Sequence, residues 1–195
     1  MKKIFSIIII LFFTSCSVGS NASRFGTGVD ITFDPRTLGM QIDDEIMQKN
    51  LKSRIFLIDA KYAVTIDIEV IDGRIFLSGD VDEPEHKIRI TKLAWETKGV
   101  RSVKSLITIE GQTDFKNTAK DVLITSKLRT ALIFTKKTLS RNYTLETINQ
   151  NIYIFGIAMD AEEKKEVINL ANNIYNVKEV IPSIYLVSEL SRNKF

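Results

Sequence analysis

The sequence predicts an α+β fold that is built twice, as two tandem domains of the order αββαβ. The chain matches itself without a gap when it is shifted by 77 residues, from about residue 44 to residue 187. Within each copy, helix-like and strand-like hydrophobic periods alternate in the same order. Each domain is therefore expected to be a three-stranded mixed sheet packed against two helices on one face.

The repeat and the ends of the chain define the expected boundaries. Domain 1 should span 43–111 and domain 2 should span 119–188, followed by a polar tail of 189–195. A signal peptide of 1–15 and a lipidated N-terminus with its tether, 16–42, are expected to precede them. After the leader about 180 residues are left, which is enough for two small domains.

The first residues have the pattern of a secretory signal. Lys2 and Lys3 precede an apolar run, 4–13, that is too short for a membrane span of roughly 20 residues. Cys16 follows this run and two small residues, which resembles a bacterial lipobox with Phe in place of the usual Leu. The resemblance implies that Cys16 is acylated, as by palmitate, and that Ser17 favours sorting to the outer membrane. The alternative is a chance cysteine in the leader; no disulfide can form within the chain, because Cys16 is its only cysteine.

An amphipathic helix opens each copy, over 44–57 in the first and over 121–134 in the second. Asp121 is expected to cap the N-terminus of the second of these helices. Apolar residues recur on one face of each helix and should pack on the core. They are Met47, Leu51 and Ile55 in the first helix, and Ile124, Leu128, Ala131 and Leu132 in the second.

A strand, a tight turn and a second strand follow in each copy. The turns are expected at Asp72-Gly73 and at 149–151, because these residue types tolerate positive φ. The first strand alternates apolar and polar residues, which predicts one buried face. Its apolar set is Val64, Ile66, Ile68 and Val70.

Two equivalent glycines, Gly79 and Gly156, should end the second strands, which are expected over 74–78 and 152–155. Neither glycine lies in a Gly-rich loop that leads into a helix, as a phosphate-binding loop requires. We therefore expect both glycines to be structural, at places where another backbone segment approaches closely.

A second helix and a third strand complete each copy. The helices are expected to start near Pro84 and at Asp160, where Asp160 and Glu163 can form a capping box. They should stop at Gly99 and Asn176, the residue types that serve as left-handed C-caps. The third strands are expected over 103–109 and 180–187.

The outer surface of the helix over 121–134 is unusual, because apolar and cationic side chains share it. Seven basic residues and one acid, Asp121, lie between 116 and 141. Such a surface suits an anionic membrane. The alternative is a solvated basic helix whose outer apolar residues pack on a neighbouring domain. The candidate lipid-binding residues are Leu123, Lys127, Arg129, Ile133, Phe134, Lys136 and Lys137.

Composition and residue types argue against several other classes of protein. Without Lys2 and Lys3 the chain has 25 basic and 24 acidic residues, so it is not a globally basic nucleic-acid binder. His86 is the only histidine and is expected to be a solvated surface residue. We expect no metal site of the usual kind and no cofactor, and we find no Ser-His-acid set.

A recurring pattern of strand, glycine, helix and a valine pair resembles the BON domain. In this sequence it comprises Gly79 with Gly99-Val100-x-x-Val103, and Gly156 with Asn176-Val177-x-x-Val180. Two such copies behind a lipoprotein leader are similar to the dual BON-domain outer-membrane lipoproteins of Gram-negative bacteria. The segments 34–44 and 121–129 resemble the family's entries into its first and second domains.

The resemblance implies a protein that is not an enzyme and is lipid-anchored at the periplasmic face of the outer membrane. It implies a role in envelope integrity and binding of anionic phospholipid, such as phosphatidylglycerol, by the first helix of domain 2. Arg129 and Ile133 match the family's basic and apolar positions. Leu123 replaces the family's Trp, a departure that weakens interfacial anchoring. The alternative is a periplasmic adaptor for outer-membrane protein assembly or cell division.

We predict that Cys16→Ala abolishes lipidation, because it removes the only thiol that can carry the acyl chain. The measurement is metabolic labelling with a fatty-acid probe, with the amount of protein checked in parallel. Equal labelling of the variant and the unchanged chain would show that the prediction is wrong.

Overall fold

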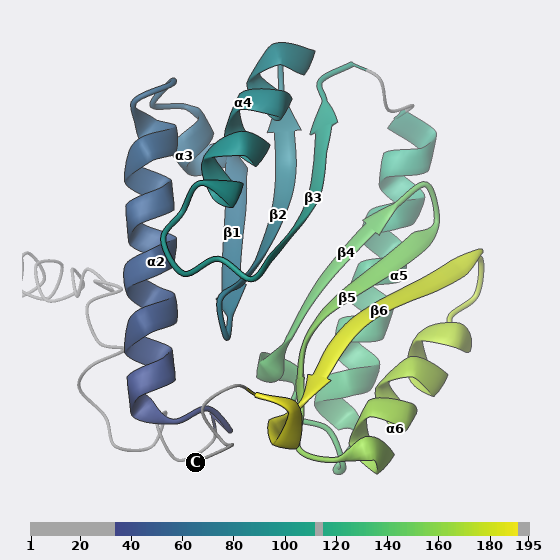
Figure 1. Cartoon of the computed structure of the whole chain (residues 1–195). Helices are drawn as coiled ribbons and strands as arrows, with labels where there is room; N and C mark the ends of the chain where they lie inside the picture. Colours follow the sequence, from purple (N-terminus) through teal and green to yellow (C-terminus); the bar gives the residue numbers. More distant parts are fainter. Residues whose placement is uncertain (1–33, 112–114, 191–195) are drawn as a thin grey trace, which may run out of the picture. The chain divides into compact units, whose positions relative to one another are not determined.

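The computed structural model describes residues 34–111 and 115–190, with the backbone alone described at Phe115 and Lys116. The leader, Cys16, most of the tether and the end of the tail lie outside the described residues. The chain from Asp34 onward forms one compact unit. Two domains of the same order lie within it, as Figure 1 shows.

Domain 1 consists of a long helix, a hairpin, a second helix and a third strand. Its elements are α2 (Leu38–Phe56), the short α3 (Tyr62–Thr65), β1 (Ile66–Ile71), β2 (Arg74–Val81), α4 (Pro84–Trp95) and β3 (Ser102–Ile109). β2 pairs antiparallel with β1 and parallel with β3, in the order β1-β2-β3. Helices α2 and α4 lie on one face of this sheet (Figure 1).

Domain 2 repeats this arrangement with a second mixed sheet, in the order β4-β5-β6. Its elements are α5 (Phe115–Phe134), the 3₁₀ turn η1 (Ser140–Asn142), β4 (Tyr143–Ile148), β5 (Asn151–Ala158), α6 (Ala161–Asn172), β6 (Glu179–Leu186) and the 3₁₀ turn η2 (Val187–Glu189). The predicted α+β class, with three strands and two main helices in each domain, is confirmed.

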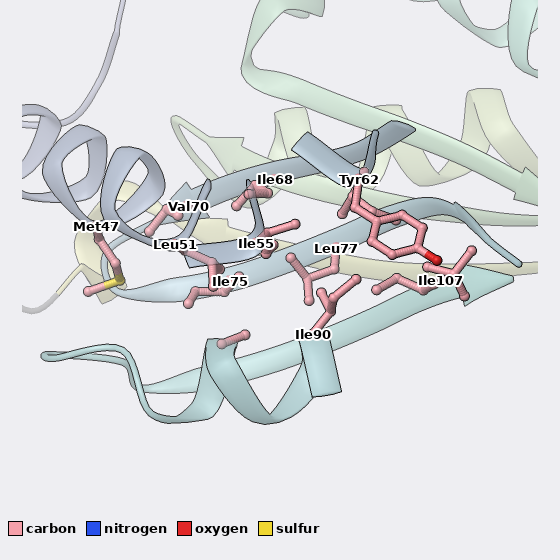
Figure 2. Close-up of a cluster of buried hydrophobic side chains, with 13 residues drawn as sticks. Met47, Leu51, Ile55, Tyr62, Ile68, Val70, Ile75, Leu77, Ile90 and Ile107 are labelled. Carbon is pink, nitrogen blue, oxygen red and sulfur yellow. The ribbon is translucent and has the colours of Figure 1, made fainter. Parts of the chain in front are cut away.

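Each domain has its own apolar core between the helices and one face of the sheet. In domain 1, Leu51 and Ile55 of α2 meet Ile75 and Leu77 of β2 and Ile90 of α4, as Figure 2 shows. In domain 2, Ile124, Leu128 and Leu132 of α5 occupy the equivalent positions. The core faces predicted for the two first helices are therefore confirmed, except that Ala131 is only half-buried.

The two first helices are longer than their apolar periodicity predicted. α2 begins at Leu38 rather than at residue 44, with the Thr37 hydroxyl accepting a hydrogen bond from the Met40 amide. α5 begins at Phe115, so Asp121 lies inside the helix, and the prediction that it is the N-cap is wrong. The apolar core stripes start at Met47 and Ile124, nine residues or about two and a half turns after the helices begin, so their periodicity did not reveal the first turns.

The hairpins form where predicted, whereas the strands differ at their ends. The turn residues Asp72, Gly73, Asn149 and Gln150 all have positive φ, which is the geometry of a type I′ turn. Val64, predicted to be a strand residue, is exposed and belongs to α3. The strands β2 and β5 continue through Gly79 and Gly156 to Val81 and Ala158.

The ends of the second helices agree with the sequence in part. α4 has Pro84 at its first position, and Asp160 of α6 accepts a hydrogen bond from the Glu163 amide. The Glu163 carboxylate accepts instead from the Leu139 and Met159 amides, so the predicted reciprocal box does not form. The left-handed residues Gly99 and Asn176 occur in the turns after the helices, which end earlier.

A third apolar cluster includes residues of both sheets. The rings of Phe76 from β2 and Phe155 from β5 stack with their centroids 5.2 Å apart. Met40 and Leu190, from the two ends of the described chain, belong to the same cluster. The sheet faces turned away from the helices thus also carry buried aromatic side chains.

The two paired glycines lie where the first strand of each hairpin begins. A Cβ atom at Gly79 would lie 2.1 Å from the Thr65 carbonyl oxygen, and Gly79 has a φ of +119°. A Cβ at Gly156 would lie 2.3 Å from the Asn142 carbonyl oxygen, without a positive φ. Any larger side chain must therefore displace backbone at either place.

We predict that Gly79→Ala and Gly156→Ala both lower the free energy of unfolding by about 1–3 kcal/mol, the usual cost of overpacking. Gly79→Ala should cost more, because a left-handed φ adds about 1 kcal/mol. Chemical denaturation of the whole chain measures both effects.

Gly111→Ala is the matched control, because Gly111 has a φ of +79° but open space around a Cβ. Gly111→Ala should lower the free energy of unfolding only by the cost of placing a side chain at a positive φ. Equal losses in all three variants would mean that the close backbone approach has no energetic role.

Candidate functional site

The helix α5 is fixed to the sheet by a buried carboxylate. Asp121 accepts hydrogen bonds from the backbone amides of Asn149 at 2.7 Å and of Gln150 at 2.8 Å. These amides belong to the type I′ turn between β4 and β5, where no ladder partner is available. The bonds connect the helix to the hairpin and determine which side of α5 faces the core.

The opposite side of α5 is exposed and strongly apolar. Leu123 is 60% exposed, Ile133 is 61% exposed and Phe134 is 82% exposed. Val122, which the sequence analysis did not single out, is as exposed as Leu123. The two pairs, 122–123 and 133–134, are 11 residues apart and thus about 16 Å apart along the helix.

Cationic side chains flank these two apolar pairs. Lys127 and Arg129 lie between the pairs and are exposed, and Lys136 is exposed just after the helix. Small polar residues, Ser126 and Thr130, occupy the centre of the outer face. We define the outer face of α5 as Val122, Leu123, Lys127, Arg129, Ile133, Phe134 and Lys136.

Lys137 differs from the other candidate cations. Its ammonium lies 2.6 Å from the Glu162 carboxylate of α6, and both side chains are exposed. The hydrogen bond from this ammonium to Glu162 raises the pKa of Lys137. Lys137 is thus already paired with an acid, and we leave it out of the outer face of α5.

The matching helix of domain 1 provides an internal comparison. Asp44 of α2 accepts from the amides of Asp72 and Gly73, as Asp121 does from Asn149 and Gln150. Burial raises the pKa of Asp44, although these two amides and the nearby Arg36 guanidinium act in the opposite direction. The two helices are therefore fixed to their hairpins in the same way.

The outer faces of α2 and α5 share apolar positions, and Lys52 takes the place of Arg129, but their net charges differ. Ile46, Phe56 and Leu57 are exposed on α2 at the positions of Leu123, Ile133 and Phe134. The positions of Lys127 and Lys136 are Asn50 and Asp59 in domain 1. An excess of positive charge thus distinguishes α5 from a helix that is otherwise similar in position and shape.

His86 is not the solvated residue that the sequence predicted. It is half-buried, its Nδ1 lies 2.8 Å from the Tyr62 hydroxyl, and Asp82 lies 3.4 Å from the same nitrogen. The Tyr62 ring is buried in the core of domain 1, so this contact satisfies its hydroxyl. An aromatic residue 24 positions away gave no signal in the sequence.

Within residues 34–111 and 115–190, no group of three or more His, Cys, Asp or Glu side chains is placed to hold a metal ion. None of the helices in this part of the chain is long and apolar enough to cross a bilayer.

The pattern of the BON domain matches the chain twice, over residues 43–111 and 120–186. The chain belongs to the BON-domain family. The family resemblance inferred from the paired glycines and valines is thereby confirmed, as are the two tandem copies. The two folds agree with this division of the chain, since each matched range covers one three-stranded sheet with its helices.

Two relatives extend this comparison along the chain. The outer membrane lipoprotein DolP of Haemophilus influenzae is 22% identical over 183 residues, which are 93% of this chain and 94% of DolP. An uncharacterized protein encoded in the gshII 5′ region of Anaplasma centrale is 28% identical over 123 residues, 63% of this chain and 82% of that protein.

Among solved structures, the chain is similar to CdsD, a structural protein of the type III secretion system of Chlamydia trachomatis. The likeness has a TM-score of 0.30 at 15% identity and covers 73% of this chain. It spans 63% of the CdsD chain, less than two thirds of its length.

Proposed function

We propose that the protein is a lipid-anchored envelope protein whose domain 2 binds anionic phospholipid through the outer face of α5. The observation that carries the proposal is the difference between two equivalent helices. Both expose apolar side chains at the same positions, but the exposed cations of α2 are accompanied by Asp43 and Glu45, whereas the acid of α5, Asp121, is buried. A helix with apolar and cationic residues on one exposed side suits an anionic bilayer surface.

The charges on α5 are sufficient for weak binding. Each Lys or Arg close to an anionic membrane contributes about 1 kcal/mol, and salt screens this attraction over about 8 Å at physiological ionic strength. Lys127, Arg129 and Lys136 supply three such charges. The acid of the helix, Asp121, is buried and bonded to the hairpin turn, so it does not offset them at the surface.

Apolar insertion adds to this attraction and fixes the depth of the helix. Leu123 and Phe134 lie near the two ends of the outer face, so a helix parallel to the bilayer inserts both. The binding is expected to be reversible. In this proposal the leader directs the chain into the envelope, and acylated Cys16 supplies the permanent anchor.

Similarity to DolP along nearly the whole chain supports a place at the outer membrane, and we assign this protein to its periplasmic face. Support of outer-membrane integrity, without catalysis, is the role that we propose there. Phosphatidylglycerol is the anionic lipid that the family resemblance favours.

A second function uses the same surface. The exposed apolar pairs of α5 also fit a protein partner, so an adaptor of outer-membrane assembly or cell division is the alternative. In this alternative, substitutions on the outer face of α5 impair the protein's function in cells. The chain then binds anionic and neutral vesicles equally.

We predict that Leu123→Glu with Arg129→Glu abolishes flotation of the chain with phosphatidylglycerol vesicles, because it removes an apolar contact and reverses a charge. The chain is used without its leader and with Cys16→Ser, so that no lipid anchor contributes. Binding of the unchanged surface should weaken at high salt and be absent with neutral vesicles.

The matched control is Ile88→Glu with Lys92→Glu on α4, which changes the net charge equally at an exposed apolar and an exposed basic residue. It should float like the unchanged chain. If the α5 variant floats normally, or both variants lose binding equally, the outer face of α5 is not the lipid site.

A further inference from the structure

The outer face of α2 carries an apolar stripe that the lipid-binding proposal does not use. One line along the helix is formed by residues spaced seven apart, Ile42, Lys49 and Phe56. Leu38, Ile46 and Leu57 border this line. All of these residues except Lys49 are apolar, and the five apolar side chains are exposed. They lie opposite Met47, Leu51 and Ile55, which pack in the core of domain 1.

The charges of α2 are separated along its length. Its N-terminal half, 38–47, contains Asp43, Asp44 and Glu45 and no basic residue. Its C-terminal half, 48–56, contains Lys49, Lys52 and Arg54 and no acid. Asp44 is buried against the hairpin turn, whereas Glu45 and Lys49 form an ion pair near the apolar stripe, one on each side of the middle of the helix. This arrangement makes the exposed face complementary to an inverted copy of itself.

An anionic bilayer does not fit this face as well as it fits α5, because the opposite charges of the two halves cancel. We propose instead that the outer face of α2 binds the same face of a second copy of this chain, with the two helices antiparallel. A two-fold axis then relates the copies, and each contact occurs twice. The proposal is independent of lipid binding by α5.

One register satisfies the apolar and the charged residues together. With the axis between residues 47 and 48, Leu38 lies opposite Leu57 of the second copy and Gly39 lies opposite Phe56. Ile42 then lies opposite Ser53. Large side chains thus meet smaller ones or apolar neighbours along the whole stripe, as close helix packing requires.

The same register pairs opposite charges across the axis. Glu45 and Lys49 already form an ion pair at 3.1 Å within one helix. In the dimer each Glu45 also lies beside Lys49 of the second copy, so four charges alternate around the axis. Like charges do not meet, whereas a parallel pair of helices would place Lys49 beside Lys49 and Glu45 beside Glu45.

The size of this face indicates a weak dimer. α2 has 19 residues and is therefore about 28 Å long. A single pair of such helices reaches only the lower end of the roughly 1,200–2,000 Å² that stable interfaces bury. Confinement of both copies to one membrane by acylated Cys16 would raise their effective concentration and favour the pair.

Disulfide trapping in cells that produce the full chain tests both the interface and its direction. We expect Ile42→Cys with Ser53→Cys to give a covalent dimer under mild oxidation, because the two positions face each other across the axis. Within one helix they are about 16 Å apart, too far for a disulfide, which needs Cα atoms within about 7 Å. The unchanged chain shows the background from Cys16.

Each single variant should stay at that background, because the axis separates the two copies of residue 42, or of residue 53, by about 16 Å. Ala119→Cys with Thr130→Cys is the matched control, since these exposed residues occupy the same positions on α5. Equal trapping in the α5 control, or in a single variant, would overturn the antiparallel α2 dimer.

A charge exchange provides a second readout, in case the cysteines disturb the helix. Glu45→Lys should reduce trapping of the double-cysteine chain, and Glu45→Lys with Lys49→Glu should restore it, because the alternation of charges is then re-formed. Thermal melts confirm that each variant is folded. A folded double-cysteine chain without a dimer above background, or trapping unaffected by Glu45→Lys, would refute the proposal.

Discussion

A carboxylate inside each long helix holds that helix to the turn of the neighbouring hairpin, and the rest of each domain depends on this contact. Asp44 and Asp121 each accept two backbone amide hydrogen bonds from a type I′ turn. Hydrogen bonds to charged groups contribute about 1.5–3 kcal/mol each, more than most neutral ones. They also fix the rotation of the helix, and hence which residues are buried and which are presented to the surroundings.

Because this attachment is the same in both domains, the surfaces of the two helices have diverged on a constant scaffold. Both helices expose apolar side chains at equivalent positions, Ile46 with Leu123 and Phe56 with Ile133. The charges around them differ: α5 is cationic along its outer face, while α2 has an acidic and a basic half. A duplicated domain can in this way provide one surface for a membrane and another for a second copy of the chain.

The sequence predicted the order of elements and the core faces because these follow from local periodicity. Met47, Leu51 and Ile55 recur at helical spacing, and the turn residues include Gly73 and Asn149, which favour positive φ. The role of Asp121 was missed, since its partners lie 28 and 29 residues away. In the same way, the pairing of Lys137 with Glu162, 25 residues later, left no local pattern.

The most direct test of the central claim compares the depth of the two helices at a membrane. Trp95 is the only tryptophan and is half-exposed, so Trp95→Phe gives a chain in which Leu123→Trp or Ile46→Trp is the only tryptophan, and its fluorescence is excited selectively at wavelengths where tyrosine does not absorb. Each chain, without leader or lipid anchor, is mixed with phosphatidylglycerol vesicles that contain a brominated-lipid quencher. Quenching at position 123 and not at position 46 is predicted. Equal quenching at both positions, or none at position 123 while the chain binds, would contradict the assignment of membrane contact to α5.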